Sequence, residues 1–205
     1  MLFSNQPLPY LVAVAIALLV GLTFHEFSHA ATADSLGDRR PRAMGRLTLN
    51  PLRHLDPIGA AMLLLVGFGW AKPVMVNPYA LRNGRQGMAF VAAAGPLSNV
   101  VVALLFGVIA RVLALAGLDA GFVLTVVFLV VWLNFVLAIF NLLPIPPLDG
   151  YNFALALLPP RFAFSLQRYA PYGVMILLLL VLLPGSPLQL LLRLADPLAR
   201  AVIGA

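Results

Sequence analysis

Residues 8–29 read LPYLVAVAIALLVGLTFHEFSH, an apolar run that leads directly into two histidines and the only glutamate of the 205-residue chain. A bilayer core about 30 Å thick requires roughly 20 apolar residues in a helix that crosses it. The run therefore predicts a membrane-spanning helix that carries three polar side chains. Ionisable side chains are expensive to place inside a membrane, so this group predicts a functional site.

The composition of the whole chain is that of a membrane protein. Apolar residues make up 62% and charged residues 10%, and the mean hydropathy is +0.99, whereas soluble domains average about 25% charged residues. Further apolar runs cover residues 88–118, 120–143 and 171–184. We expect an all-α polytopic membrane protein with about four to five transmembrane helices. It should form a single domain over residues 1–205, with a core at about 8–160.

Three segments depart from this pattern. Residues 57–71 (PIGAAMLLLVGFGWA) are short for a span and contain three glycines, which favours a re-entrant segment. Residues 45–50 and 73–77 alternate and are bounded by Pro and Asn, which predicts a small β element on the cytoplasmic side. The tail, residues 187–203, carries one polar stripe and predicts an interfacial amphipathic helix; a poorly ordered terminus is the alternative.

The positive charges orient the chain in the membrane. Eight of the thirteen Lys and Arg residues lie between residues 39 and 85, and the positive-inside rule places such a segment in the cytoplasm. The first helix then runs from outside to inside, with His25 and His29 near its cytoplasmic end. We interpret the net charge of +6 as topology and contact with anionic lipid. We expect a multi-pass protein of a bacterial cell membrane with no nucleic-acid partner.

The segment His25-Glu26-Phe27-Ser28-His29 matches the pattern H-E-x-x-H. On a helix, residues i and i+4 project from the same face, so His25 and His29 can hold one metal ion. Glu26 is rotated roughly 100° away. It can reach a water on that metal without being a ligand, as in zinc hydrolases. If both histidines were ordinary core residues, they would need two separate acceptors on one apolar helix face, so ligation is the better explanation.

A catalytic zinc site usually has a third protein ligand and one open position. Asp149 is the acid that stands apart from the polar loops, because it follows the third apolar run in NLLPIPPLDG, residues 141–150. The prolines end that span, and Gly150 permits close backbone approach. Asp149 then returns to the membrane face of His25. The alternative is that Asp149 caps a helix that begins after the prolines.

With these motifs the chain resembles the site-2 protease family of intramembrane zinc metalloproteases. The likeness rests on HEFSH and NLLPIPPLDG, and also on GPLSN at 95–99 and on the segments 50–59 and 69–78. It covers roughly residues 20–155 with the motifs in the family's order. No PDZ or CBS domain is recognisable, so we expect a minimal form of the family.

The resemblance implies a zinc metalloendopeptidase that cleaves peptide bonds in or near transmembrane segments of substrate proteins. One Zn²⁺ per chain would be bound by His25, His29 and Asp149, and a zinc-bound water would be activated by Glu26. The family also places Asn141 near the metal, where its amide can stabilise the oxyanion; interhelical hydrogen bonding is the alternative. The alternative function is a metal-ion transporter or channel that uses the same His/Asp cluster.

Three further polar residues are expected to have other roles. Asn134 shares a helix face with Asn141 and is expected to be structural. Asn99, in GPLSN, is expected to act in packing around the site and is a weaker site candidate. His54 lies in a basic, proline-flanked loop, which predicts a surface position. A catalytically inactive scaffold is also conceivable, but the intact motif argues against it.

Overall fold

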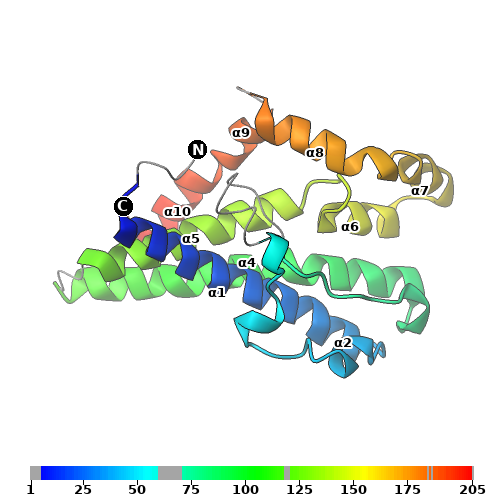
Figure 1. Cartoon of the computed structure of the whole chain (residues 1–205), viewed down its shortest axis with the longest axis horizontal. Helices are drawn as coiled ribbons and strands as arrows, with labels where there is room; N and C mark the ends of the chain where they lie inside the picture. The colour runs from blue at the N-terminus through cyan, green and yellow to red at the C-terminus, as the bar shows by residue number, and fades with distance from the viewer. Residues whose placement is uncertain (1–5, 60–70, 118–120, 184, 186, 205) are drawn as a thin grey trace.

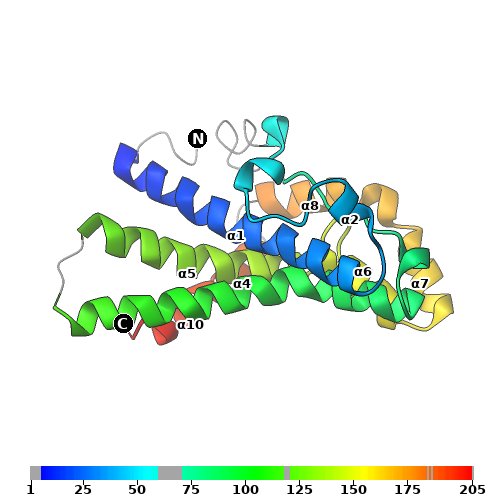
Figure 2. The same cartoon turned by 90° about the horizontal axis from the view of Figure 1, so that it is seen from below.

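The structure, a computed structural model, describes residues 6–59, 71–117, 121–183, 185 and 187–204. Its centre is a bundle of three long helices that lie side by side in Figure 1 and Figure 2, namely α1 (Leu8–Ser35), α4 (Gly84–Leu115) and α5 (Gly121–Asn141). Short helical turns connect the first two of these: α2 (Arg40–Ala43), η1 (Pro51–Arg53) and η2 (Pro78–Ala80). The chain after the bundle forms α6 (Asp149–Leu157), α7 (Pro160–Gln167), η3 (Ala170–Tyr172), α8 (Gly173–Leu182), α9 (Pro187–Leu192) and α10 (Ala195–Ile203).

The long apolar helices confirm that the chain is a mostly helical, polytopic membrane protein. The described residues contain three candidate spans, or four if the bent pair Pro160–Gln167 and Ala170–Leu180, which meet at 41°, counts as one. The described part of the chain reaches four spans, the lower end of the prediction, when the bent pair is counted, and three when it is not. Most of the re-entrant segment predicted at residues 57–71 lies outside the described residues.

Proline and glycine mark the two ends of α1. Pro9 lies in the first turn, where a missing N–H breaks no intrahelical hydrogen bond. After the last turn, Gly37 adopts a φ of +114°, which favours glycine. The N–H groups of Gly37 and Asp38 donate to the carbonyls of Asp34 (3.1 Å) and Ala33 (3.0 Å). This cap stops the helix and turns the chain back toward the bundle.

Small side chains let the three long helices approach one another closely. Ala13 and Ala17 of α1 are fully buried in one cluster with Val130 of α5. Helices in a membrane are held together by close packing and hydrogen bonds, because lipid is as apolar as leucine. Larger residues such as Leu105 and Val108 of α4 are exposed, as expected for side chains that face lipid.

No strand forms within the described residues, so the prediction of a small β element is wrong. One isolated antiparallel bridge, between Leu55 and Ala71, occurs there instead. Residues 45–50 form turns and bends, because the side chain of Asn50 caps η1. The alternating pattern in that segment therefore belongs to a capped turn.

Residues 73–77 are extended but pair with no strand in the described chain. On one side of the segment, the N–H of Lys72 donates to the His54 carbonyl at 2.8 Å. At the other end, the N–H of Asn77 donates to the Asp38 carboxylate at 2.7 Å. Loop atoms therefore fix the segment without making it part of a sheet.

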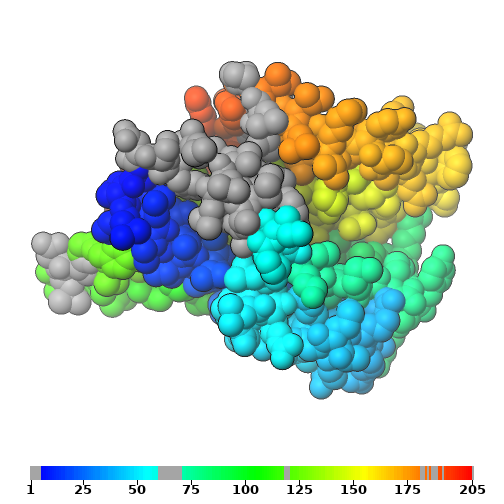
Figure 3. All heavy atoms as spheres, viewed as in Figure 1, coloured from blue at the N-terminus to red at the C-terminus, as the bar shows by residue number. Residues whose placement is uncertain are grey.

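The segment after α1 folds back over the C-terminal half of that helix, as Figure 3 shows. Asp38 is 1% exposed and accepts two hydrogen bonds from the guanidinium of Arg40, at 3.0 and 2.9 Å. Arg46 is also buried and donates to the Lys72 carbonyl at 3.3 Å. These contacts tie the segment to the extended residues 73–77.

The C-terminal helix packs on the bundle. Ala195 and Ala199 of α10 are fully buried in a cluster with residues of α4 and α5. The side chain of Arg111 donates to the carbonyl of Val202 at 2.7 Å and thereby caps α10. The tail predicted at residues 187–203 is thus two short helices, and its interfacial position stays a prediction.

Candidate metal centre and active-site cleft

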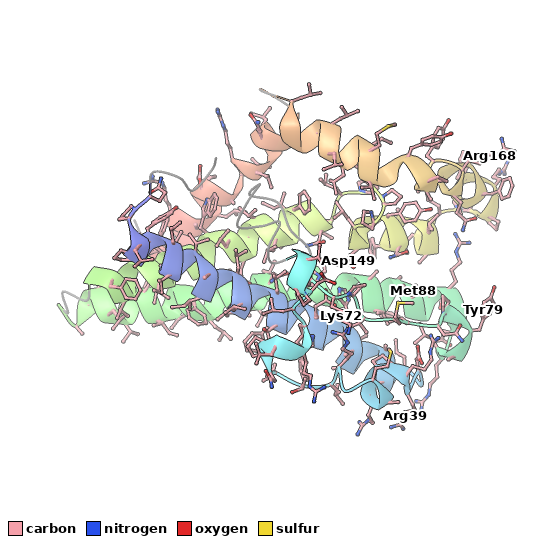
Figure 4. The ribbon with its side chains drawn as sticks, in the orientation of Figure 1. Arg39, Lys72, Tyr79, Met88, Asp149 and Arg168 are labelled. Carbon is pink, nitrogen blue, oxygen red and sulfur yellow. The ribbon has the colours of Figure 1, made fainter. Side chains whose placement is uncertain are left out.

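Two helices that are far apart in the sequence bring three ligand-type side chains together. His25 and His29 lie on one face of α1 and are 5% and 7% exposed. Asp149 is the first residue of α6, after the proline-rich turn that ends α5. Figure 4 shows it near the middle of the molecule. The N-cap of α6 is Leu148, so Asp149 is not the capping residue.

The three side chains meet through one atom each. The Nε2 atoms of His25 and His29 are 3.0 Å apart. Asp149 Oδ2 lies 2.9 Å from Nε2 of His25 and 3.1 Å from Nε2 of His29. This is a group that could hold one metal ion.

The outer nitrogen of His25 is held by a buried amide network. Asn99 donates through Nδ2 to the Gly21 carbonyl at 3.0 Å and to Asn134 Oδ1 at 2.8 Å. Its Oδ1 is therefore an acceptor for His25 Nδ1–H, at 2.6 Å. Both asparagines are 0% exposed. The network leaves the lone pair of His25 on Nε2, which is the tautomer of a metal ligand.

His29 has the same arrangement with a different partner. Its Nδ1–H donates to the backbone carbonyl of Val91 at 2.7 Å, which leaves a lone pair on Nε2. Two imidazole lone pairs and one carboxylate oxygen therefore face one another. A single proton could bridge one of these three contacts, whereas a cation satisfies all three. The donor set thus fits a metal ion.

A glycine makes room for both imidazole rings. A Cβ atom built on Gly95 of α4 would lie 2.6 Å from Nε2 of His25 and would also collide with Nε2 of His29. Any side chain at this position would push the rings away from Asp149. Gly95 and Asn99, four residues apart in the GPLSN segment, therefore both act on the centre from α4.

A cleft of about 410 Å³ opens onto the three ligand atoms. Glu26 lines this cleft and is half-buried. The segment before η2 contributes Ala71, Pro73, Val74 and Val76 to the lining of the cleft, and the end of α5 contributes Leu137, Phe140 and Asn141. The cleft thus places a carboxylate, three candidate ligands and an extended backbone segment around one space.

The structure places two further sequence candidates differently. Asn141 lines the cleft, but one of its amide hydrogens is used in a 3.0 Å bond to the Leu137 carbonyl of its own helix. His54 is 1% exposed and donates through Nε2 to the Thr48 carbonyl at 2.8 Å, so its predicted surface position is wrong. The loop folds around the His54 ring, and His54 is not part of the centre.

Sequence reasoning missed one polar residue in the cleft. Asn152 lines the cleft from α6, three residues after Asp149. The i, i+3 spacing from a proposed ligand is the signal that could have found it. Its neighbour Tyr151 is buried, and burial raises the pKa of the Tyr151 phenol above its ordinary value, so the phenol stays neutral.

Comparison with known proteins identifies the family of the chain. The model of peptidase family M50 matches residues 112–183, which include α5, the proline-rich turn and Asp149 of α6. The Bacillus subtilis protein "Putative zinc metalloprotease YwhC" is 40% identical over 194 residues, which cover 89% of this chain and 85% of that protein.

Two mycobacterial relatives are also named as zinc metalloproteases. "Putative zinc metalloprotease Rip2" of Mycobacterium tuberculosis is 36% identical over 191 residues, which cover 87% of this chain and 71% of the relative. Its namesake in Mycolicibacterium smegmatis is 32% identical over 188 residues, with 88% and 71% covered. No solved structure gives a significant match.

The fold and the site define an integral membrane metalloprotease. The chain belongs to peptidase family M50, the site-2 protease family of zinc metalloproteases.

Proposed function

We propose that this protein is an intramembrane zinc metalloendopeptidase that cleaves peptide bonds in or next to transmembrane segments of substrate proteins. The observation that carries the proposal is the convergence of His25, His29 and Asp149 within 3.1 Å inside a membrane helix bundle. His25 lies ten residues before the end of α1, about 15 Å at 1.5 Å per residue. The cleft is therefore suited to a substrate within the bilayer.

The donor set favours zinc among the divalent metals. His25, His29 and Asp149 would hold the ion through two imidazole nitrogens and one carboxylate oxygen, a ligand set typical of catalytic zinc sites. When bound, Zn²⁺ supplies a Lewis acid that lowers the pKa of water and polarises a carbonyl oxygen. Asn99 and the Val91 carbonyl would orient the two imidazoles toward it.

Glu26 is the proposed general base. Its carboxylate lines the cleft and is rotated away from the converging atoms of His25 and His29. It can take a proton from the attacking water and deliver that proton to the leaving amine nitrogen. Asn141 is proposed to stabilise the oxyanion with its second amide hydrogen, because the first is bonded to the Leu137 carbonyl.

The substrate must lose helical structure before it can react. A transmembrane helix satisfies its own backbone hydrogen bonds, so its peptide bonds are shielded. Residues 73–76 are extended (Figure 1) and lie in no ladder within the described chain, and Pro73, Val74 and Val76 line the cleft. Pairing of an unwound substrate with these residues would replace part of the lost hydrogen bonding.

The proposed location is a bacterial cell membrane with the cleft near the cytoplasmic face. The basic segment between residues 39 and 85 supports this orientation through the positive-inside rule. The relatives from Bacillus subtilis and Mycobacterium tuberculosis are bacterial proteins, which supports a bacterial source.

The transporter alternative needs a continuous polar route, and the described helices α1, α4 and α5 show none beyond the metal centre. Asn99 and Asn134 lie between the centre and the outer half of the bundle, and both are 0% exposed. Asn134 ends the network by donating to the carbonyl of Val130, at 2.7 Å. These amides bond to one another and to the backbone, which favours a structural role.

The test combines metal analysis of the purified protein with cleavage of a panel of single-span substrates. We expect Glu26→Gln to keep zinc and to lose cleavage, and Asp149→Asn to lose most of its zinc. Asp196→Asn, the same change on α10, should keep full zinc content. Full activity of Glu26→Gln would defeat the proposal. Transport of metal ions across the membrane of liposomes that contain the protein, without proteolysis, would also defeat it.

A further inference from the structure

Asn152 lies in the active-site cleft beside the proposed ligand Asp149. Both residues belong to α6, and a separation of three residues places them on the same helix face. Both line the cleft, as do Val74 and Val76 of the extended segment. Asn152 is half-buried there. Asn152 therefore shares one cleft with the proposed metal ligands and with the extended segment.

The side chain of Asn152 has unused hydrogen-bonding capacity. It makes no hydrogen bond to any other residue in the part of the chain that the structure describes. The other asparagines near the centre are engaged: Asn99 and Asn134 in the buried network, and Asn141 with the carbonyl of Leu137. Asn152 therefore offers two amide hydrogens and one carbonyl oxygen to the cleft.

The chemistry of the cleft indicates the partner. Val74, Val76 and Phe140 give it apolar walls, and an amide without a partner in such surroundings is destabilised. A peptide main chain carries the matching groups. In an extended chain the N–H and C=O of one residue point to the same side, so one asparagine amide can bond both. An α-helix has already used these groups internally.

We infer that Asn152 binds the main chain of the unwound substrate next to the scissile bond, through two hydrogen bonds to the N–H and C=O of one extended residue. This inference rests on the proposed function. Together with the extended segment in the same cleft, Asn152 would hold the substrate main chain at two places. The two hydrogen bonds go to main-chain groups of the substrate and not to its side chains. They therefore favour substrate segments that are unwound near the cleavage point.

The first test separates substrate binding from the metal centre. Asn152→Leu keeps the approximate volume and removes both hydrogen bonds. We expect kcat/KM to fall about tenfold, as for the loss of two ordinary hydrogen bonds, with zinc content and thermal unfolding unchanged. Gln167→Ala, which removes an exposed amide from α7 outside the cleft, should match the wild type.

The second test identifies the backbone contact itself. Substrates are made in which single amides flanking the scissile bond are replaced by esters, which removes one N–H at a time. We expect one ester position to lower kcat/KM in the wild type and to have no effect in Asn152→Leu. Asn152→Ala gives the same comparison if leucine disturbs α6.

The outcomes distinguish this inference from the proposed function. If the wild type with bound zinc cleaves no substrate, the proposed function fails. If the wild type cleaves but Asn152→Leu is equally active, or if every ester acts alike in both proteins, the role of Asn152 is overturned while the protease assignment stands.

Discussion

The side chain of Asn99 connects all three long helices through one amide. It accepts from the His25 ring of α1 and donates to Asn134 of α5 and to the Gly21 carbonyl. Its oxygen and both amide hydrogens are thereby used inside an apolar bundle. The residue therefore fixes the His25 tautomer and the helix packing at the same time.

Replacement of Asn99 should weaken metal binding without touching a ligand. In Asn99→Leu, the Nδ1–H of His25 loses its acceptor, and the ring can turn or change its tautomer. We expect zinc affinity to fall about 10- to 100-fold, the usual effect of losing a partner that orients a ligand. Competition with a fluorescent chelator measures it. Asn134→Leu keeps the direct contact between Asn99 and His25, so its zinc affinity should fall less. Equal zinc affinity of Asn99→Leu and the wild type would contradict the proposal that Asn99 orients His25.

At the scale of elements, α6 is fixed at both ends. Its first residue, Asp149, meets the histidines of α1. At its last turn, the guanidinium of Arg85 donates to the Leu155 carbonyl at 2.9 Å and also to the Leu158 carbonyl. Such a cation satisfies helix carbonyls that have no intrahelical partner. Arg85 therefore holds the helix that presents Asp149.

Removal of the hydrogen bonds from Arg85 should destabilise α6 and lower the affinity for the metal modestly. We expect Arg85→Ala to reduce the free energy of unfolding by about 1 kcal/mol, the scale of a lost cap and its hydrogen bonds. Zinc affinity should fall a few fold, because Asp149 is less well placed. Denaturation in detergent and chelator competition measure the two effects. Arg82→Ala, an exposed arginine with no side-chain partner in the described chain, is the control and should show neither.

The extended segment gives a second prediction at this scale. Proline at Val74 or Val76 removes a backbone N–H that could pair with substrate. We expect turnover of a helical transmembrane substrate to fall, with zinc content unchanged. The comparison substrate is a short peptide that is already unfolded, whose turnover should fall less. Unchanged turnover of the helical substrate would contradict pairing with this segment.

The whole molecule has two distinct ends. Figure 1 shows the start of α1 and the end of α10 toward one end of the bundle and the loop around α2 toward the other end. Arg39 and Tyr79, both from the basic segment between residues 39 and 85, lie toward that second end in Figure 4. The charge distribution therefore predicts which end faces the cytoplasm.

Single cysteines can test this orientation because the chain contains none. Tyr79 is 97% exposed in the basic half, and Leu115 is 89% exposed at the end of α4. We expect a membrane-impermeant thiol reagent to label Leu115→Cys in intact cells and Tyr79→Cys only after permeabilisation. The wild type, without a thiol, gives the background. The reverse pattern would invert the proposed topology.

The sequence by itself determined the features that arise from local patterns, namely the apolar runs and the H-E-x-x-H spacing. Span length, helix periodicity and the shared face of His25 and His29 depend on residues within a few turns of one another. Asp149 could be nominated because prolines must end the preceding span. The local pattern was misleading for residues 45–50, where the cap at Asn50 outweighs alternation.

Only the tertiary structure decided which distant residues meet. The contact of His29 with Asp149 spans 120 positions and that of His25 with Asn99 spans 74. Both depend on how α4 and α6 are rotated and how closely they approach α1, which Gly95 permits. Rotation and approach of helices are set by packing over the whole bundle, and no local spacing encodes them.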